Sequence, residues 1–144
     1  MSQGNLPDVF LDTDVAFDII SKREPHFEAS IVLMELAARN IIRPVISESC
    51  LANLFYLAFD IYKIKDAAKR LPDLIGACEI VGAGKEAIIQ ALNSSFRDKE
   101  DALQYHTASR MGADYFVTRN KKDYRAGVDS LPVYTPQEFS KLVS

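Results

Sequence analysis

The sequence has few of the residues that build zinc sites and disulfide frameworks. Its 144 residues include two cysteines, Cys50 and Cys78, and two histidines, His26 and His106. The cysteines lie far apart and form no CxxC pair, and neither histidine has a partner at a spacing suited to zinc. We therefore expect two buried free thiols in a reducing compartment, and no zinc centre.

Long apolar runs are also missing. No stretch approaches the roughly 18 apolar residues of a transmembrane helix, and the first residues lack the basic and then apolar segments of a secretory signal. We therefore expect a cytoplasmic protein with no membrane contact. With 48% hydrophobic residues the chain can still bury its own core. Its length predicts a single domain at 8–144 behind an N-terminal tail at 1–7.

An excess of positive charge is absent too, because the net charge is −3. This argues against a protein that coats nucleic acid through counterion release. It leaves room for an enzyme that meets nucleic acid at one local site. Basic residues gather at 63–70 and at 119–125. The first stretch is typical of a solvated face, whereas the second lies beside acidic residues and is as much a functional candidate as a surface one.

Short apolar runs alternate with helical patterns along the chain. This alternation predicts an α/β domain with a central, mostly parallel sheet flanked by helices. Pro44 places its strand near an edge of the sheet or marks the start of that strand. The predicted strands lie at 9–11, 41–46, 79–81, 114–117 and 131–134, and the predicted helices at 15–20, 30–39, 51–58, 66–75, 86–93, 98–111 and 135–142.

Polar clusters rich in carboxylates stand beside three of these elements, at 12–14, 98–101 and 118–123. Asp12 and Asn120 directly follow strands, so both should lie at the carboxyl edge of the sheet, where ligands of such sheets bind. Two unit charges about 4 Å apart repel by roughly 4 kcal/mol at an effective dielectric constant of about 20. Mg²⁺ relieves such repulsion and prefers oxygen ligands. The clusters therefore predict a site for Mg²⁺ or Mn²⁺.

The residues that follow strands also have plain structural roles open to them. Asp12 could end its strand or cap the next helix, and Asp14 could cap the helix predicted at 15–20. Asn120 and Asp123 could be turn residues, since asparagine tolerates left-handed geometry. These roles stay open beside the metal-binding role.

The acids at the start of the helix predicted at 98–111 have different roles. An aspartate at an N-cap with an acid three residues later resembles a capping box, and one good cap contributes about 1 kcal/mol. We favour Asp98 as the cap and Asp101, on the same helix face, as a metal ligand. We expect Glu100 to face solvent.

Four segments together resemble the PIN domain, the metal-dependent ribonuclease fold used by VapC-type toxins. The resemblance spans nearly the whole chain, and its last segment is the most specific, with an Ala-Asp lead, a β run, Thr-Arg-Asn, and an acid followed by an aromatic residue. The segments are VFLDTDV at 9–15, VISESCLANL at 45–54, DKEDAL at 98–103 and ADYFVTRNKKDY at 113–124.

The resemblance assigns roles to individual positions. It implies that Asp12 is the first metal-binding aspartate and that Asp101 is the acid opening the helix before the last segment. Asn120 falls where a fourth acid often stands, and Asp123 is the nearby carboxylate that could replace it. The glutamate of the family falls on Asn53, an amide. With asparagine at two of the four positions, less negative charge is available to hold Mg²⁺ or Mn²⁺.

Further positions follow from the same resemblance. Thr13 and Asp14 stand where the family often has a small hydroxyl residue and an asparagine, and Asp98 could restore a charge. Arg119 or Lys121 would position neighbouring phosphates. The candidate catalytic residues are Asp12, Asp98, Asp101, Asn120 and Asp123, all but Asp123 as metal ligands, and the candidate substrate or supporting contacts are Asp14, Asn53, Thr118, Arg119 and Lys121.

The implied activity is metal-dependent hydrolysis of RNA phosphodiester bonds, with RNA as substrate, a homodimer as the assembly and, for a toxin, a small antitoxin protein as partner. Three alternatives stay open. One is a catalytically weak or inactive PIN module that binds RNA or a protein. The second is a haloacid-dehalogenase-type phosphohydrolase, because Phe10-Leu-Asp-Thr-Asp14 mimics its nucleophile motif. The third is a receiver-like domain, which would need an adjacent acid pair that is not evident.

Overall fold

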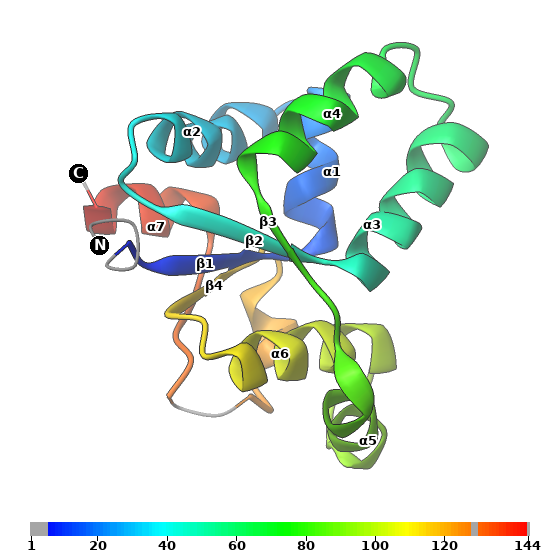
Figure 1. Ribbon diagram of the computed structural model, residues 1–144, viewed down its shortest axis with the longest axis vertical. Helices are drawn as coiled ribbons and strands as arrows, with labels where there is room; N and C mark the ends of the chain where they lie inside the picture. The colour runs from blue at the N-terminus through cyan, green and yellow to red at the C-terminus, as the bar shows by residue number, and fades with distance from the viewer. Residues whose placement is uncertain (1–5, 128–129, 144) are drawn as a thin grey trace.

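The computed structural model describes residues 6–127 and 130–143. Residues 1–5 of the predicted tail and Ser144 at the end of the predicted domain lie outside the described residues. In the described stretches, helices cover both faces of one β-sheet (Figure 1). Every helix in these stretches is too short or too polar to cross a membrane.

The sheet has five strands in the order β3-β2-β1-β4-β5, and each neighbouring pair is parallel. This confirms the predicted α/β fold. Pro44 is the second residue of an interior strand, so of the two predicted placements the strand start applies. The strands are β1 (Asp8–Leu11), β2 (Arg43–Ser47), β3 (Glu79–Val81), β4 (Tyr115–Val117) and β5 (Val133–Tyr134).

Alternation along the strands divides the apolar side chains between two cores. In β1, Val9 and Leu11 pack into one core, whereas Phe10 packs into the other. Figure 1 shows the corresponding helix layers on either side of the sheet. The first core is covered by α1 (Thr13–Ser21), α2 (Phe27–Ala38), α3 (Glu48–Phe55), α4 (Ala67–Ala77) and α7 (Pro136–Val143), and the second by α5 (Gly84–Asn93) and α6 (Lys99–Met111).

Two short helical segments of other types were not predicted from the sequence. A π-helical segment, η2 (Tyr56–Ile61), continues α3, and a 3₁₀ helix, η3 (Lys121–Tyr124), follows β4. The thiols of Cys50 and Cys78 are free, as expected, but only Cys50 is fully buried. Burial raises the pKa of each thiol to about 12, so both stay protonated.

Polar side chains cap the N-termini of several helices, and Thr135 caps α7 by accepting from the backbone N–H of Glu138 at 3.1 Å. Ser47 caps α3 by accepting from the backbone N–H of Cys50, and Asp98 caps α6, as predicted. Of the two capping roles left open for the first helix, that of Asp12 is confirmed and that of Asp14 is wrong. That helix begins at Thr13 rather than at position 15, so Asp12 is its N-cap and Asp14 lies in its first turn.

The order of the strands creates a crevice at their carboxyl ends. From the central β1 the chain passes outward to β2 and β3 on one side, and then returns to β4 and β5 on the other. The segments that leave β1 and β4 therefore diverge, which is the arrangement that opens a ligand crevice in parallel sheets. Asp12 and Thr118 are the first residues beyond these two strands.

Candidate active site

Asp12 is fixed by hydrogen bonds at the bottom of this crevice. Its side chain is buried, with the residue 5% exposed, and its backbone N–H donates to Val117 O at 3.0 Å. Its Oδ1 accepts from the backbone N–H of Thr13 at 2.7 Å. Its Oδ2 accepts from the hydroxyl groups of Thr118, at 2.7 Å, and Tyr124, at 2.9 Å. Three donors therefore hold this carboxylate in one orientation.

Asp101, in the first turn of α6, meets the same hydroxyl group. The Tyr124 hydroxyl lies 3.2 Å from Asp101 Oδ1. Burial, with repulsion from Asp14, raises the pKa of Asp12 to about 7. Burial, with repulsion from Asp12 and Asp98, raises the pKa of Asp101 to about 7. Burial and the two carboxylates raise the pKa of Tyr124, so its hydroxyl stays protonated and supplies one proton to two acceptors.

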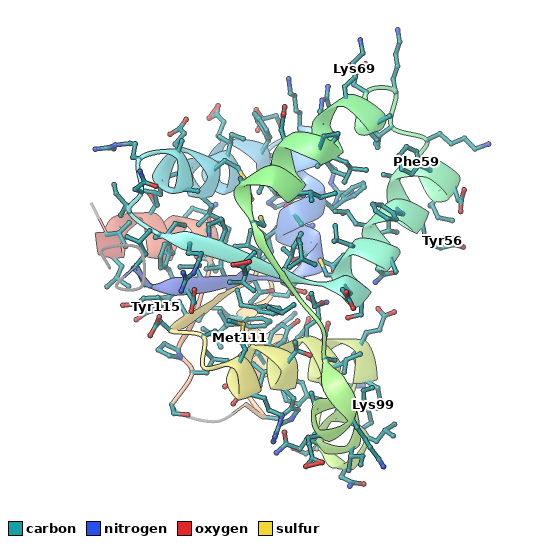
Figure 2. The ribbon with its side chains drawn as sticks, viewed as in Figure 1. Tyr56, Phe59, Lys69, Lys99, Met111 and Tyr115 are labelled. Carbon is teal, nitrogen blue, oxygen red and sulfur yellow. The ribbon has the colours of Figure 1, made fainter. Side chains whose placement is uncertain are left out.

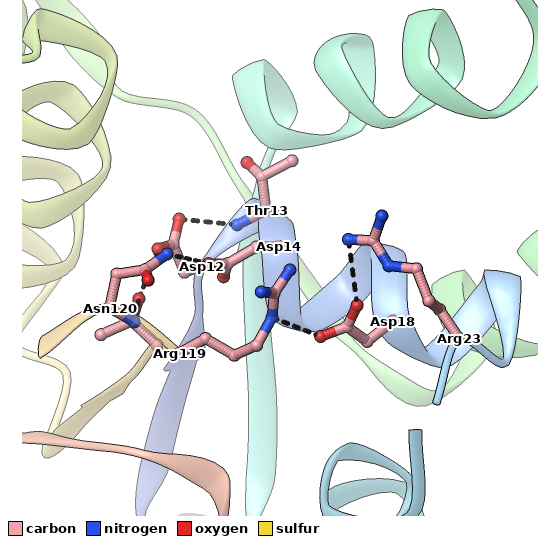
Figure 3. A network of polar contacts seen from close by, with 8 residues as sticks. Asp12, Thr13, Asp14, Asp18, Arg23, Arg119 and Asn120 are labelled. Carbon is pink, nitrogen blue, oxygen red and sulfur yellow. Dashed lines mark hydrogen bonds and ion pairs between the residues drawn. The ribbon is translucent and has the colours of Figure 1, made fainter. Parts of the chain in front are cut away.

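Asp14 and Asn120 meet beside this pair (Figure 3). The side-chain amide of Asn120 donates to Asp14 Oδ2 at 2.9 Å. Asp14 Oδ1 is buried and has no hydrogen-bond partner among the described residues. Burial raises the pKa of Asp14. The predicted meeting of residues that follow β1 and β4 is therefore confirmed.

Gln104 adds a second unpartnered oxygen to this region. Its Nε2 donates to Thr13 Oγ1 at 2.8 Å, whereas its Oε1 is buried without a partner in the described part of the chain. An unsatisfied buried acceptor costs about 1–3 kcal/mol. Two such oxygens near two carboxylates indicate a place where a positively charged group would be stabilised.

These groups surround one acidic cavity of about 240 Å³. Its lining combines six predicted site residues with Glu100, Gln104 and several apolar or basic side chains. The predicted residues are Asp12, Asp14, Asn53, Asp101, Asn120 and Asp123, and the remaining lining residues are Thr13, Phe17, Arg23, Leu57, Tyr62, Glu100 and Gln104.

Glu100 does more than face solvent. It is exposed, as expected, but its Oε1 accepts from the side-chain amide of Asn53 at 3.1 Å. The bond joins α3 to α6 at the border of the acidic cavity. A carboxylate thus stands beside Asn53, the position where the family resemblance led us to expect a glutamate.

Two of the predicted site residues, Asp98 and Arg119, do not line the cavity but bond to neighbouring structure. Asp98 Oδ1 accepts from the backbone N–H groups of Glu100, at 2.8 Å, and Asp101, at 3.2 Å, and Asp98 does not line the cavity. Arg119 donates to Asp18 Oδ2 at 2.7 Å, and Arg23 also approaches Asp18, at 3.6 Å (Figure 3). Asp18 thereby neutralises two cations near the cavity.

Sequence reasoning passed over Asp18, Gln104 and the hydroxyl of Tyr124. Helical spacing could have found the first two, because Asp18 lies four residues after Asp14 and Gln104 three residues after Asp101. Tyr124 belongs to the most specific segment of the resemblance, but only as its aromatic residue. Its distinguishing feature is the hydroxyl that a phenylalanine lacks.

The donor set suits a hard divalent cation. No three acidic, histidine or cysteine side chains within 6–127 and 130–143 are already arranged to hold a metal ion together. The unpartnered oxygens of Asp14 and Gln104 nevertheless line the same cavity as Asp12 and Asp101. Mg²⁺ and Mn²⁺ prefer such oxygen ligands, and a cation would favour the ionised form of both carboxyl groups.

Known proteins share this fold and sequence pattern. A family model for the PIN domain matches residues 8–122. Ribonuclease VapC1 of Aquifex aeolicus (strain VF5) is 26% identical over 140 residues, which cover 94% of each chain. VapBC2 from Rickettsia felis, bound to a DNA fragment from its promoter, matches 89% of this chain and 98% of its own, with a TM-score of 0.68 and 19% identity. A toxin–antitoxin complex from Klebsiella pneumoniae matches 90% of this chain and 98% of its own, with a TM-score of 0.67 and 20% identity.

Proposed function

Because the chain belongs to the PIN domain family, we propose that it is a metal-dependent endoribonuclease that hydrolyses RNA phosphodiester bonds. One observation carries the proposal: Asp12 and Asp101, from separate elements, lie close enough in the crevice to share the Tyr124 hydroxyl. A relative named as a ribonuclease aligns over 94% of the chain, which supports the same activity.

Asp12, Asp14 and Asp101 would hold the metal ion, with Gln104 Oε1 as a further oxygen donor. A bound Mg²⁺ or Mn²⁺ would neutralise charge on the scissile phosphate and lower the pKa of a nucleophilic water. Thr118 and the backbone of Thr13 keep Asp12 in position by hydrogen bonding. Fixed ligands of this kind avoid the cost of reorganisation during the reaction.

Asn120 and Asp123 complete the proposed centre in different ways. Asn120 orients Asp14 through its 2.9 Å hydrogen bond, which suits a positioning role. Asp123 is exposed and lines the acidic cavity, where it adds negative charge beside Asp101. Asp98 acts on the centre through the backbone of α6, whose first turn carries Asp101.

We further propose that the chain is the toxin of a toxin–antitoxin pair and forms a homodimer. The solved relatives include toxin–antitoxin proteins, which supports a small antitoxin as partner. Tyr56 and Phe59 on η2 (Figure 2) and Tyr62 directly after it are each about half exposed, and Leu92 on α5 is 63% exposed. A partner chain would cover apolar surface of this kind. The free thiols of Cys50 and Cys78 support a cytoplasmic location.

A second function keeps specific support. Asn53 and Asn120 stand where family resemblance places acids, which favours a weak or inactive module that binds RNA or a protein. Glu100 beside Asn53 works against this alternative, because it returns a carboxylate to that part of the cavity. The haloacid-dehalogenase-type alternative loses its support, since the family match spans residues 8–122.

The test is incubation of a structured RNA with the protein and Mn²⁺, with and without EDTA. We expect cleavage that disappears in EDTA. Metal binding should be followed by calorimetry in parallel. Absence of cleavage together with metal binding weaker than millimolar would favour the inactive module instead.

A further inference from the structure

A larger hollow adjoins the acidic cavity. It has a volume of about 600 Å³ and is formed by the segment before α6, the first turn of α6, and η3 with the residues that follow it. Asp101 and Asp123 line both hollows, so the two meet at these carboxylates. We call the larger one the basic groove, after the side chains of Arg97, Lys122 and Arg125 in its wall.

Within the part of the chain that the structure describes, the three cations of the basic groove have no partners. Arg97, Lys122 and Arg125 are exposed, and none of them forms a hydrogen bond or ion pair with another residue of 6–127 and 130–143. They come from two separate segments, one before α6 and one around η3. Cations that have no partner in the protein can pair with the phosphates of a nucleic acid strand and release its counterions.

Arg119 and Lys121, which the sequence led us to expect at neighbouring phosphates, are each paired with an acid of the protein. Arg119 is paired with Asp18 at 2.7 Å, and Lys121 is paired with Glu138 at 3.1 Å. Both therefore hold neighbouring elements together. Among the described residues, the unpaired charge in the basic stretch at 119–125 therefore belongs to Lys122, within η3, and Arg125, directly after it.

The basic groove also contains three acids, Asp98, Asp101 and Asp123, but they do not neutralise its cations. Asp98 is engaged with two backbone N–H groups at the start of α6. Asp101 and Asp123 stand at the border with the acidic cavity, and a bound divalent cation would offset their charge. None of the three groove cations lines the acidic cavity. Positive charge thus begins where the carboxylates end.

On the basis of the ribonuclease function proposed above, we propose that the basic groove holds the RNA backbone on one side of the scissile bond. Arg97, Lys122 and Arg125 contact successive phosphates there, while the scissile phosphate lies over the acidic cavity. Contacts of this kind position the strand and carry no base specificity. Binding through them weakens with salt, by a slope of about −0.7 per phosphate contact on a single strand.

The test compares two triple variants that remove the same number of charges. The groove variant is Arg97→Gln, Lys122→Gln and Arg125→Gln, and the control variant is Arg39→Gln, Lys65→Gln and Lys69→Gln. The control positions are exposed and lie at the C-cap of α2, in the segment before α4 and in α4, across the sheet from α6. Figure 2 shows Lys69 at the opposite end of the molecule from Lys99, the first residue of α6.

Binding of a fluorescein-labelled single-stranded RNA is measured by anisotropy in EDTA, which prevents cleavage, over a series of salt concentrations. We expect the groove variant to bind roughly tenfold or more weakly at low salt and to lose about 2 from its salt slope. The control variant should bind within about threefold of the wild type. The single variants Lys122→Gln and Arg125→Gln, which change exposed side chains, should each show part of the loss.

Equal losses of RNA affinity in both triple variants would overturn the proposed role of the groove, because net charge alone would then explain binding. Wild-type binding by the groove variant would overturn it as well. Cleavage in Mn²⁺ is measured beside binding. If the wild type cleaves RNA and the groove variant binds and cleaves RNA as the wild type does, the RNA-binding role of the groove is rejected, whereas the ribonuclease function is retained. If the wild type binds RNA through the groove but never cleaves it, the ribonuclease fails.

Discussion

Asp12, directly after β1, and Asp101, in the first turn of α6, share a single phenolic hydroxyl group. The Tyr124 hydroxyl lies 2.9 Å from Asp12 Oδ2 and 3.2 Å from Asp101 Oδ1. The tyrosine ring is held by the core beneath it, with its centre 4.7 Å from that of Phe116 and 5.8 Å from that of Phe96. Aromatic packing in the second core therefore sets where the two carboxylates meet.

Removing this hydroxyl should loosen the carboxylate pair. Tyr124→Phe keeps the ring packing but leaves Asp101 Oδ1 and one side of Asp12 Oδ2 without a donor. We expect a loss of about 1–3 kcal/mol in the free energy of unfolding of the metal-free protein near pH 8, where the carboxylates are ionised. Urea unfolding in EDTA measures this loss.

The dependence of this loss on pH tests the nature of the bond. A hydrogen bond to an ionised carboxylate is stronger than one to a neutral carboxyl group, so Tyr124→Phe should cost less at about pH 5.5 than at about pH 8. Tyr134→Phe is the control, because the ring of Tyr134 also packs against aromatic neighbours while its hydroxyl forms no hydrogen bond with another described residue, so the change should cost little at either pH. A Tyr124→Phe loss that is independent of pH would contradict a bond to ionised carboxylates.

The metal-free protein should lose stability as the pH rises. Asp12 and Asp101 each have a pKa of about 7 in the folded chain, against 3.8 for an ordinary aspartate. Between these values the folded state binds more protons than the unfolded state, so the free energy of unfolding falls with rising pH. The contribution levels off above about pH 8, where both states are ionised.

Thermal melts in EDTA at about pH 5.5 and about pH 8 measure this dependence. The variants Asp12→Asn and Asp101→Asn should each show a smaller fall in Tm than the wild type. Mn²⁺ should raise the Tm of the wild type more at the higher pH, because it binds ionised carboxylates. An unchanged pH dependence in both variants would show that other groups cause it.

Part of this site follows from sequence periodicity. Asp12 and Asn120 each follow a strand, and parallel strands bring such residues to one edge, as the bond between Asn120 and Asp14 confirms. Asp98 as a helix cap and Asp101 on the cavity side were likewise predictable from helical spacing. Local patterns of this kind depend on backbone geometry that the neighbouring residues already determine.

The remaining features depend on long-range packing. The position of the Tyr124 hydroxyl requires η3 to turn its ring beneath β4, and no local pattern specifies that turn. The pairing of Arg119 with Asp18 joins residues from the two ends of the chain. Glu100 meets Asn53 only because α3 and α6 converge at the cavity. Each contact is a product of the tertiary fold.

Restoring a carboxylate at position 120 should strengthen metal binding. Asn120→Asp replaces the amide that donates to Asp14 with a second negative charge. We expect a lower Tm in EDTA, because two carboxylates then repel, and a several-fold tighter Mn²⁺ affinity by calorimetry. Asn93→Asp, an equal change at an exposed position on α5, is the control. Weaker Mn²⁺ binding by Asn120→Asp would contradict a metal site beside Asp14.

Asp18 should matter for stability more than an ordinary surface acid does. It is fully buried and pairs with Arg119 at 2.7 Å, so Asp18→Asn leaves a half-buried cation without its counter-charge. We expect a loss of about 3 kcal/mol in the free energy of unfolding. Asp66→Asn, which breaks the more exposed pair with Arg70, should cost less than about 1 kcal/mol. Equal losses in urea unfolding would show that Asp18 is not a structural anchor.

The most direct test of the proposed catalytic centre is the single-turnover rate of RNA cleavage in Mn²⁺ for Asp12→Asn and Asp101→Asn. Asp73→Asn, an equal change at an exposed residue of α4, serves as the control. We predict that both site variants lose at least about a hundredfold in rate, while the control keeps the wild-type rate. Mutation of residues that only support metal ligands already lowers metal affinity or activity about 10- to 100-fold, so loss of a ligand should cost at least as much. Cleavage at the wild-type rate by both site variants would contradict the assignment.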